Sequence, residues 1–333
     1  MRKIKKLAAV LLSGIMAFSA MNVASVLVSA AEISSVSAAQ SEASDFACTV
    51  LDDGTAEITK YSGKDAVVVI PSEIDGIKVT SIGYGAFNYN DTAESVTIPD
   101  GVTNIGELAF NNCSALKSVA VPDSVTYIGS DAFSESKLLE SIVIPKGVKN
   151  IESQTFRNCQ GLKSVVLPEG VEKISTMAFK DCKALESISL PETLTYIDFG
   201  AFDSCFALND ITIPKSVTYI SDFAIGYNMN YFMKIDGVVI RGVAGSAAEE
   251  YANSNGFEFV EIVKETIIGD ADGDGKISID DVTCIQKYCA ALSVDFIDLN
   301  LADVNYDGVI NIDDTTLIQK HLANLIDLNA TAN

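Results

Sequence analysis

A 23-residue period in the middle of the chain constrains the fold more than any other feature of the sequence. The seven prolines share one phase, and each step between Pro99 and Pro214 is 23 residues. Phenylalanine recurs at the same interval from Phe87 to Phe202, and Ile225 closes the series. The repeating unit reads L-x-x-V-x-I-P-x-x-V-T-x-I-x-x-x-A-F-x-x-C. A short fixed period with apolar positions in phase predicts a solenoid, because one coil cannot bury its apolar side alone and stacked coils bury a continuous core.

Both ends of the array carry the signals of a cap, which a solenoid needs to cover its terminal coils. Residues 46–61 alternate around an Asp-Asp-Gly turn, which predicts a β-hairpin at the first coil. At the other end, Ser246 and Glu249 have the spacing of a capping box, and we expect the helix that they open to stop at Gly256. Strands are expected on either side of this helix, at 237–240 and 257–262.

The first 31 residues have the composition of a secretory signal peptide. A basic segment, MRKIKK, precedes an apolar run that ends in small residues, so we expect cleavage near Ala30 or Ala31. The alternative is a retained membrane anchor, but glycine and polar residues interrupt the apolar run. Residues 32–45 are rich in Ser and Ala and are expected to form a flexible leader.

The chain is strongly acidic, with 45 Asp and Glu against 23 Lys and Arg and a formal net charge of −22. Loss of the signal peptide would remove four basic residues, which leaves 19 and a net charge of −26. This balance argues against nucleic acid and anionic lipid as partners, because their phosphate groups would be repelled. It suits a secreted, extracellular protein.

Seven cysteines in an exported protein invite a disulfide interpretation, but their phase favours another one. Four of them lie three residues after the repeat phenylalanine: Cys113, Cys159, Cys182 and Cys205. Ser136 fills the same slot in an intervening coil, so we expect a ladder of small buried side chains. A bridge between adjacent coils, Cys159–Cys182 or Cys182–Cys205, stays open as an alternative because coils stack about 5 Å apart.

Two rows of surface positions run along the coils. The first alternates in charge and is expected to support the stack through ion pairs: Glu94, Lys117, Glu140, Lys163 and Glu186. The second row holds three tyrosines: Tyr127, Tyr196 and Tyr219. Tyrosines in a row could stack on sugars or anchor a protein, and the alternative is that they are ordinary amphipathic surface residues.

The repeated IP-x-x-V-T-x-I-x-x-x-AF-x-x-C and the opening VVVIPSEIDGIKVTSIGYGAF resemble the BspA-type leucine-rich repeats of bacterial surface antigens. Residues 116–122 match the L-x-x-L-x-L strand of leucine-rich repeats. The resemblance covers residues 46–263 and implies a right-handed, β-rich leucine-rich-repeat solenoid with 23-residue coils. It is specific for the fold and implies little about function.

Two twelve-residue loops, 270–281 and 303–314, share a pattern of oxygen-bearing side chains at positions 1, 3, 5, 9 and 12, with glycine at position 6. Calcium prefers roughly six to eight oxygen ligands, and a loop of this spacing wraps the ion while position 7 gives a backbone carbonyl. The sequence therefore predicts two Ca²⁺ ions. The expected ligands are Asp270, Asp272, Asp274, Lys276, Ser278 and Asp281 in the first loop, and Asp303, Asn305, Asp307, Val309, Asn311 and Asp314 in the second.

Each loop leads into an amphipathic helix, and no long helix precedes the first loop. A duplicated loop–helix unit with aspartate at position 12 and isoleucine at position 8 resembles the type I dockerin domain. The resemblance covers residues 266–326 and leaves 327–333 as a tail. It implies a small all-α module that docks, in a calcium-dependent way, to a cohesin module on the scaffold protein of a cellulosome-like assembly. Cys284 and Cys289 correspond to leucines in the second copy and are expected to be core positions.

In dockerins, the residues that recognise a cohesin lie at loop positions 10 and 11 and about one or two turns further along the helix. The resemblance therefore implies that eight side chains face a cohesin: Ile279, Asp280, Gln286 and Lys287 in the first copy, and Ile312, Asp313, Gln319 and Lys320 in the second. The two copies are identical at these positions, which permits docking in either of two orientations related by the internal repeat, a hypothesis that leaves one or two orientations open. The alternative is that these residues are merely solvated helix faces.

The single histidine, His321, lies in the C-terminal module, so no Ser-His-Asp or Cys-His nucleophile can be built in the solenoid. Carboxylate pairs for glycoside hydrolysis remain chemically available because acidic residues are plentiful. We expect a non-catalytic adaptor, in which the dockerin-like module attaches to a scaffold and the solenoid presents a protein- or polysaccharide-binding surface. The alternatives are a carbohydrate-active enzyme and a structural spacer in the same assembly.

Overall fold

The computed structural model describes residues 41–262, 267–273, 275–294 and 297–328. The expected signal peptide and most of the expected leader, residues 1–40, lie outside these ranges, as do Asp274 and the end of the expected tail, 329–333. The chain divides into two compact units, Met1–Ile262 and Val263–Asn333. Within the described ranges, no helix is both long enough and apolar enough to cross a membrane.

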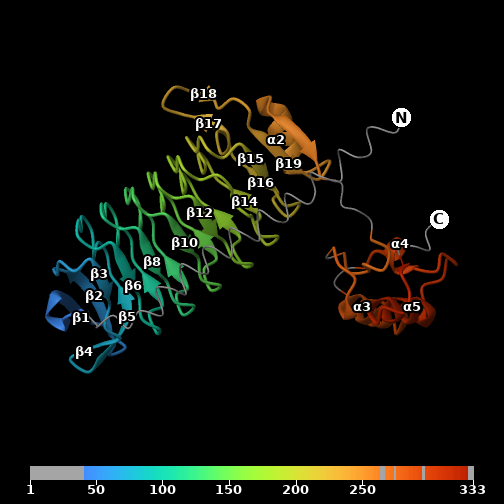
Figure 1. The fold of residues 1–333 in the computed structure, drawn as a ribbon, viewed down its shortest axis with the longest axis horizontal. Coiled ribbons are helices and arrows are strands. Elements are labelled where there is room, and N and C mark those ends of the chain that lie inside the picture. Colours follow the sequence, from blue (N-terminus) through green and yellow to red (C-terminus); the bar gives the residue numbers. More distant parts are fainter. Residues whose placement is uncertain (1–40, 263–266, 274, 295–296, 329–333) are drawn as a thin grey trace. The chain divides into compact units, whose positions relative to one another are not determined.

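On one side of the solenoid, five coils carry a short strand of a parallel sheet (Figure 1). Side chains alternate along a strand, so the central Val96 and Ile142 are buried while the residues beside them are half-exposed. Ser95 pairs with Ser118 across neighbouring strands, which is the 23-residue step of the sequence. The strands are β3 (Val67–Val69), β6 (Ser95–Thr97), β8 (Ser118–Ala120), β10 (Ser141–Val143) and β12 (Ser164–Val166).

A second side of the coils carries two-residue strands, most of which bury an isoleucine and leave the preceding residue on the surface. β5 (Ile77–Ile82) begins this side and pairs antiparallel with β4 (Glu73–Ile74). The β4–β5 hairpin holds the extra residues of the first repeat, in which the proline step is 28 residues. The later strands are β7 (Asn104–Ile105), β9 (Tyr127–Ile128), β11 (Asn150–Ile151), β13 (Lys173–Ile174), β14 (Tyr196–Ile197) and β16 (Tyr219–Ile220).

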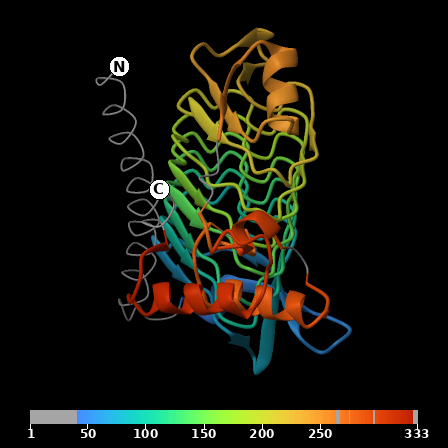
Figure 2. The ribbon, with the colours of Figure 1, turned by 90° about the vertical axis from the view of Figure 1, so that its right-hand side faces the viewer.

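The third side of the coils is a turn that stacks the repeat phenylalanines. Neighbouring rings from Phe87 to Phe202 have centroids 4.8 to 5.5 Å apart and lie nearly parallel. The backbone of the turn bonds to the next coil, as when the Phe110 N–H donates to the Ala132 carbonyl at 2.7 Å. Figure 2 shows the resulting stack of coils. The sequence period therefore becomes an aromatic ladder through the core.

The N-terminal cap is the expected antiparallel hairpin, formed by β1 (Phe46–Val50) and β2 (Ala56–Tyr61). Tyr61 stacks on the first ring of the ladder, with centroids 4.9 Å apart. The cap begins earlier than the expected end of the leader at residue 45. The short helix η1 (Ala43–Asp45) precedes β1, and the Ser41 N–H donates to the Val69 carbonyl at 3.2 Å. Composition gave no sign of this contact because a backbone hydrogen bond requires no particular side chain.

The C-terminal cap contains the expected helix and strands, namely β19 (Val239–Gly242), α2 (Ala247–Asn255) and β20 (Glu258–Glu261). The helix ends at Gly256, whose φ of 65° lies in the left-handed region that glycine favours. The expected capping box is wrong, because the Ser246 side chain accepts no capping hydrogen bond. Instead, Glu249 Oε2 accepts from the Gly245 N–H at 2.7 Å, one residue before the helix cap.

A hairpin that the sequence did not predict lies between the last repeat coil and this cap. It consists of β17 (Tyr227–Asn228) and β18 (Met233–Lys234), paired antiparallel. The chain then returns to the solenoid, where β15 (Asp210–Thr212) pairs in parallel with β19.

The four cysteines in phase with the repeat form the expected ladder of buried side chains, and all are free thiols. Each Sγ donates to the carbonyl oxygen of the repeat phenylalanine one coil earlier, at 3.1 to 3.2 Å. Ser136 Oγ makes the same bond to the Phe110 carbonyl at 2.8 Å. The slot therefore selects a small side chain that can donate a hydrogen bond.

The second unit is all-α in its regular structure, with α3 (Ile279–Cys289), α4 (Leu299–Ala302) and α5 (Ile312–Leu322). Val282 and Ile285 of α3 and Ile318 of α5 belong to its core. Cys284 is buried, as expected. The expectation for Cys289 is wrong, because this thiol is exposed at the last residue of α3.

Candidate functional site

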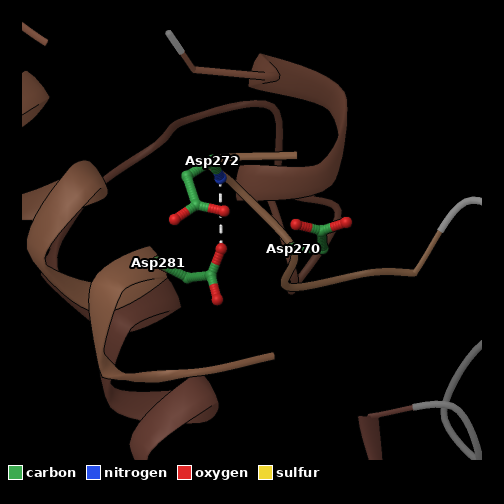
Figure 3. Close-up of side chains that lie close together, drawn as sticks. All are labelled: Asp270, Asp272 and Asp281. Atoms are coloured by element: carbon green, nitrogen blue, oxygen red, sulfur yellow. Dashed lines mark hydrogen bonds between the residues drawn. The ribbon is translucent and has the colours of Figure 1, made fainter. Parts of the chain in front are cut away.

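Three carboxylates converge where the first loop runs into the N-terminus of α3 (Figure 3). One oxygen each from Asp270, Asp272 and Asp281 lies within 4.8 Å of the others. Asp270 and Asp281 are buried, and Asp272 is half-buried. Like charges at this separation repel strongly in a partly desolvated site unless a cation joins them. The cluster therefore fits a divalent cation with oxygen ligands.

Asp281 connects the loop to the helix through the backbone. Its Oδ1 accepts from the Asp272 N–H at 3.1 Å, and its Oδ2 accepts from the Ser278 N–H at 2.7 Å. Ser278 in turn caps the N-terminus of α3, which completes a capping box. Burial raises the pKa of Asp281, and the hydrogen bonds from Asp272 and Ser278 act in the opposite direction. One carboxylate at position 12 thus fixes positions 3 and 9.

The second loop repeats this arrangement around Asp314, which is fully buried. Asp314 Oδ2 accepts from the Asn311 N–H at 2.9 Å, and Oδ1 accepts from the Val304 N–H at 3.0 Å and the Asn305 N–H at 3.4 Å. Asn311 caps α5 as Ser278 caps α3. The two loops therefore share their geometry although positions 3 and 9 differ in residue type.

Glycine at position 6 turns the chain in both loops. Gly275 and Gly308 have φ of 92° and 80°, which a residue with a side chain adopts only with strain. Each glycine N–H donates to the carboxylate at position 1, Asp270 or Asp303, at 2.9 Å. This bond aims the position 1 carboxylate into the loop.

The remaining expected ligands of the second loop bring amide and carbonyl oxygens as well as carboxylate. Asn305 Nδ2 donates to Asp307 Oδ2 at 3.0 Å, and Asn311 Nδ2 donates to the Val309 carbonyl at 3.1 Å. The side chains of Lys276 and Val309, at position 7, are exposed, as suits residues that offer only a backbone carbonyl. Hard oxygen donors of these three kinds are the ligands that calcium prefers, so the described residues fit that ion.

Comparison with known families agrees with this geometry. Residues 268–323 match the dockerin type I domain family. The BspA type leucine rich repeat region family matches in six copies, over residues 80–183 and 126–236. The chain joins BspA-type leucine-rich repeats to a type I dockerin domain. Type I dockerin domains bind calcium, which accounts for the acidic loops.

Similar solved structures are of leucine-rich repeat proteins. One from Bacteroides ovatus ATCC 8483 is 30% identical, with a TM-score of 0.52, over 60% of this chain and 55% of its own. One from T. pallidum is 29% identical, with a TM-score of 0.45, over 56% of this chain and 99% of its own. This chain thus spans about half the length of the first protein. No curated protein matches the chain.

On the dockerin domain, all eight side chains expected to face a cohesin are exposed. Ile279 and Ile312, at the start of α3 and α5, are 59% and 61% exposed, which is high for isoleucine. The lysines of the set, Lys287 and Lys320, lie in the last turns of the same helices. Because α3 and α5 pack through other faces, the eight residues are available in both copies.

Two further exposed leucines of the dockerin domain were missed in the sequence. Leu292 and Leu325 are 61% and 72% exposed. Their N–H groups donate to the carbonyls of Lys287 and Lys320, at 2.9 and 2.8 Å, so both helices end in the same way. The 33-residue offset between the leucines, equal to that between the loops, was the signal that could have found them.

The charged row of the solenoid forms ion pairs between neighbouring coils. Lys117 Nζ lies 2.7 Å from Glu94 Oε2, and Lys163 Nζ lies 3.6 Å from Glu140 Oε2. All four side chains are about half exposed, so each pair contributes at most about 1 kcal/mol to stability. This row supports the stack only weakly.

The tyrosine row is not a continuous aromatic platform. Tyr196 and Tyr219 stack on each other at 4.7 Å, and Lys173 Nζ lies 4.6 Å from the centroid of the Tyr196 ring. Side chains of the two neighbouring coils therefore cover the Tyr196 ring, which is half-buried. Tyr127, which is 41% exposed, pairs with Asn104 rather than with another aromatic residue.

Proposed function

We propose that this protein is a secreted, non-catalytic adaptor that docks to a cohesin on a scaffold protein and presents its solenoid as a binding surface. The observation that carries the proposal is the duplicated loop–helix unit, because both copies have the same loop geometry and expose the same four side chains. A dockerin domain implies a cohesin partner, so attachment through this unit is the proposed role.

Each loop is proposed to hold one Ca²⁺ ion through the six residues named for it above. The buried carboxylates of Asp281 and Asp314 support this assignment, because their backbone contacts fix the ligands at positions 3 and 9. Bound calcium would neutralise carboxylates that otherwise repel one another. Docking is therefore proposed to require calcium.

The solenoid is proposed to bind a protein or a polysaccharide without catalysing a reaction. Its matched family is a repeat of non-catalytic type, and its described residues are committed to coils, ladders and caps. The basic and apolar segments at the N-terminus support export with cleavage near Ala30 or Ala31. The mature protein would then be held in a multiprotein complex at or near the cell surface.

The proposal is tested by a pull-down from the culture supernatant of the producing organism. The mature protein is the bait, calcium is present during binding, and EDTA elutes the partners for mass spectrometry. The expected result is release of a cohesin-bearing protein by EDTA. A matched bait with Asp281→Ala and Asp314→Ala serves as control and is expected to retain none. If the wild-type bait retains no partner in a calcium-dependent way, the proposed attachment is wrong.

A further inference from the structure

The hairpin of β17 and β18 interrupts the period of the solenoid. The register between β15 and β19 pairs Asp210 with Val239, a step of 29 residues where the repeat takes 23. The extra residues follow Ile225, the last position of the repeat series, and build the hairpin. Figure 1 shows it at one edge of the solenoid, beyond the turns of the neighbouring coils.

Three consecutive large apolar side chains form the aromatic tip of this hairpin, defined as residues 231–233. Tyr231, Phe232 and Met233 are 73%, 78% and 62% exposed. Single exposed apolar residues are common, but a contiguous group marks an interaction site. Aromatic residues and methionine are also enriched at the centres of protein–protein interfaces. The aromatic tip therefore has the composition of a binding anchor.

A buried carboxylate holds one side of the hairpin to the last coil. Asp203 is fully buried, and its Oδ1 accepts from the Met229 N–H at 2.8 Å and from Ser204 Oγ at 3.0 Å. Its Oδ2 is paired with the ammonium group of Lys180 in the preceding coil. In the earlier coils the position of Asp203 holds Asn88, Asn111, Ser134, Arg157 and Lys180, so a carboxylate in this row occurs first at Asp203, next to the hairpin.

Lys234 holds the other side of the hairpin to the C-terminal cap. Its ammonium group donates to the carbonyls of Asn255 and Gly256 at the end of α2, both at 3.1 Å. It also lies 5.4 Å from the centroid of the Phe257 ring. The tip is thus presented from a base fixed on both strands, and a fixed base lowers the entropy lost on binding.

The charges around the hairpin indicate what kind of partner would fit. Asp222 and Asp236, which flank the two strands along the chain, are exposed. Lys234, the basic residue between them, directs its ammonium group to α2. Exposed carboxylates thus lie along the chain on both sides of the hairpin, and with the net charge of −22 a complementary surface would combine an apolar pocket with basic side chains.

Two other occupants suit these observations less well. A membrane surface that carries anionic lipid would be repelled by the exposed aspartates and by the net charge of −22. A second copy of the chain, joined tip to tip, would bury only three side chains from each copy, far less than the roughly 1,200 Å² of a small stable interface. A pocket on a protein partner would surround the three protruding side chains and bury more of their surface than a flat contact.

We infer that the aromatic tip inserts into an apolar pocket, bordered by basic side chains, on a protein partner of the solenoid. This inference rests on the proposed function, because it names the element with which the solenoid meets its partner. Phe232 is the central residue of the tip and its most exposed side chain.

The test uses photo-crosslinking of the full chain with secreted and cell-surface proteins of the producing organism. One variant carries Phe232→p-benzoylphenylalanine and its control carries Tyr84→p-benzoylphenylalanine, because Tyr84 is 68% exposed but lies in the first coil. The expected result is one protein adduct specific to position 232. The purified partner should then have an affinity for wild type at least about tenfold higher than for Phe232→Ser. Its affinity for Tyr84→Ser should equal that for wild type.

The inference is overturned if no adduct is specific to position 232, or if Phe232→Ser binds the partner as wild type does. Sedimentation with phosphatidylcholine vesicles or self-association on size exclusion, lost in Phe232→Ser, would reassign the tip to lipid or to a second copy. Thermal unfolding checks that Phe232→Ser is folded. Its calcium-dependent binding to a cohesin, measured in parallel, shows whether the adaptor function stands when the tip inference fails.

Discussion

The thiol of Cys182 donates a hydrogen bond to the carbonyl oxygen of Phe156, one coil earlier in the solenoid, at 3.2 Å. The same bond recurs wherever the slot holds cysteine, and Ser136 makes it with a hydroxyl at 2.8 Å. Each bond satisfies a buried carbonyl next to the aromatic ladder. The slot thus links the cysteine ladder to the phenylalanine ladder along the array.

Two substitutions of Cys182 test whether this position requires a hydrogen-bond donor or only a small side chain. Cys182→Ser keeps a donor in a slot where Ser136 already fits, so we expect a small loss of stability. Cys182→Ala removes this bond but leaves the Phe156 carbonyl its bond from the Cys159 N–H at 3.2 Å, so it should lower the free energy of unfolding by about 0.5–1.5 kcal/mol. Urea unfolding in the presence of calcium measures both. A larger loss for Ser than for Ala would contradict the hydrogen-bond assignment.

Burial of the cysteine ladder predicts a stability that falls in alkali. Burial raises the pKa of the Cys113 thiol to about 12 in the folded protein. In the unfolded chain the pKa of a cysteine thiol is about 8.5. Between these values the unfolded state binds fewer protons than the folded state, so the free energy of unfolding falls as pH rises. The slope is up to about 1.4 kcal/mol per pH unit for each such thiol.

Unfolding measured at a series of pH values between about 8 and 10 checks this sign, with Cys113→Ser as the matched variant. The variant should show a shallower decline than wild type. In the folded protein, iodoacetamide should react with the exposed Cys289 and spare Cys113, which is 1% exposed. Rapid labelling of Cys113 in the folded protein would contradict the buried ladder.

Removal of calcium should unfold the dockerin domain and leave the solenoid folded. Residues 270–325 contain eleven aspartates, and without cations those in the loops repel one another. We expect EDTA to collapse the dispersed amide resonances of residues 267–328 while those of the solenoid stay in place. Asp281→Ala should produce the same change in the first loop, whereas Asp280→Ala, at an exposed neighbour, should not. An unchanged spectrum in EDTA would show that the fold does not depend on calcium.

The internal repeat of the dockerin domain predicts two equivalent docking orientations. Asp280→Ala with Lys287→Ala removes the proposed contacts of one copy, and Asp313→Ala with Lys320→Ala removes those of the other. Each pair alone should weaken cohesin binding only about twofold, because one of two orientations is left. All four substitutions together should weaken it by about a hundredfold or more. Calorimetric titration measures these affinities, and the two-orientation hypothesis fails if either pair alone abolishes binding.

Periodicity was the part of this fold that the sequence predicted well. The constant step of Pro99 to Pro214 and of the repeat phenylalanines defined the coils. The structure confirms the buried ladders of phenylalanine and of cysteine side chains. A repeat places many residues in equivalent positions, so the pattern averages out local ambiguity. The dockerin loops were predictable for a related reason, since each fixes its oxygen ligands at set positions along the chain.

Features that occur once in the chain were harder to predict. The β17–β18 hairpin has no repeat partner in the sequence, and it is anchored by a distant residue, Asp203, which accepts from the Met229 N–H. The capping box at Ser246 failed because Glu249 reaches Gly245 instead. Cys289 was placed in the core by analogy with the second copy, but the buried contact of α3 lies nearer its start. At the hairpin and at Cys289 a tertiary contact decided the outcome, whereas at Ser246 a competing local hydrogen bond did.

The central claim is calcium-dependent docking, and direct binding to an immobilised cohesin from the producing organism tests it most directly. Wild type is measured in calcium and in EDTA, beside a variant with Asp281→Ala and Asp314→Ala. The account predicts tight binding of wild type in calcium, loss of that binding in EDTA, and no binding by the variant under either condition. Equal binding of wild type with and without calcium, or no binding to any cohesin of that organism, would contradict it.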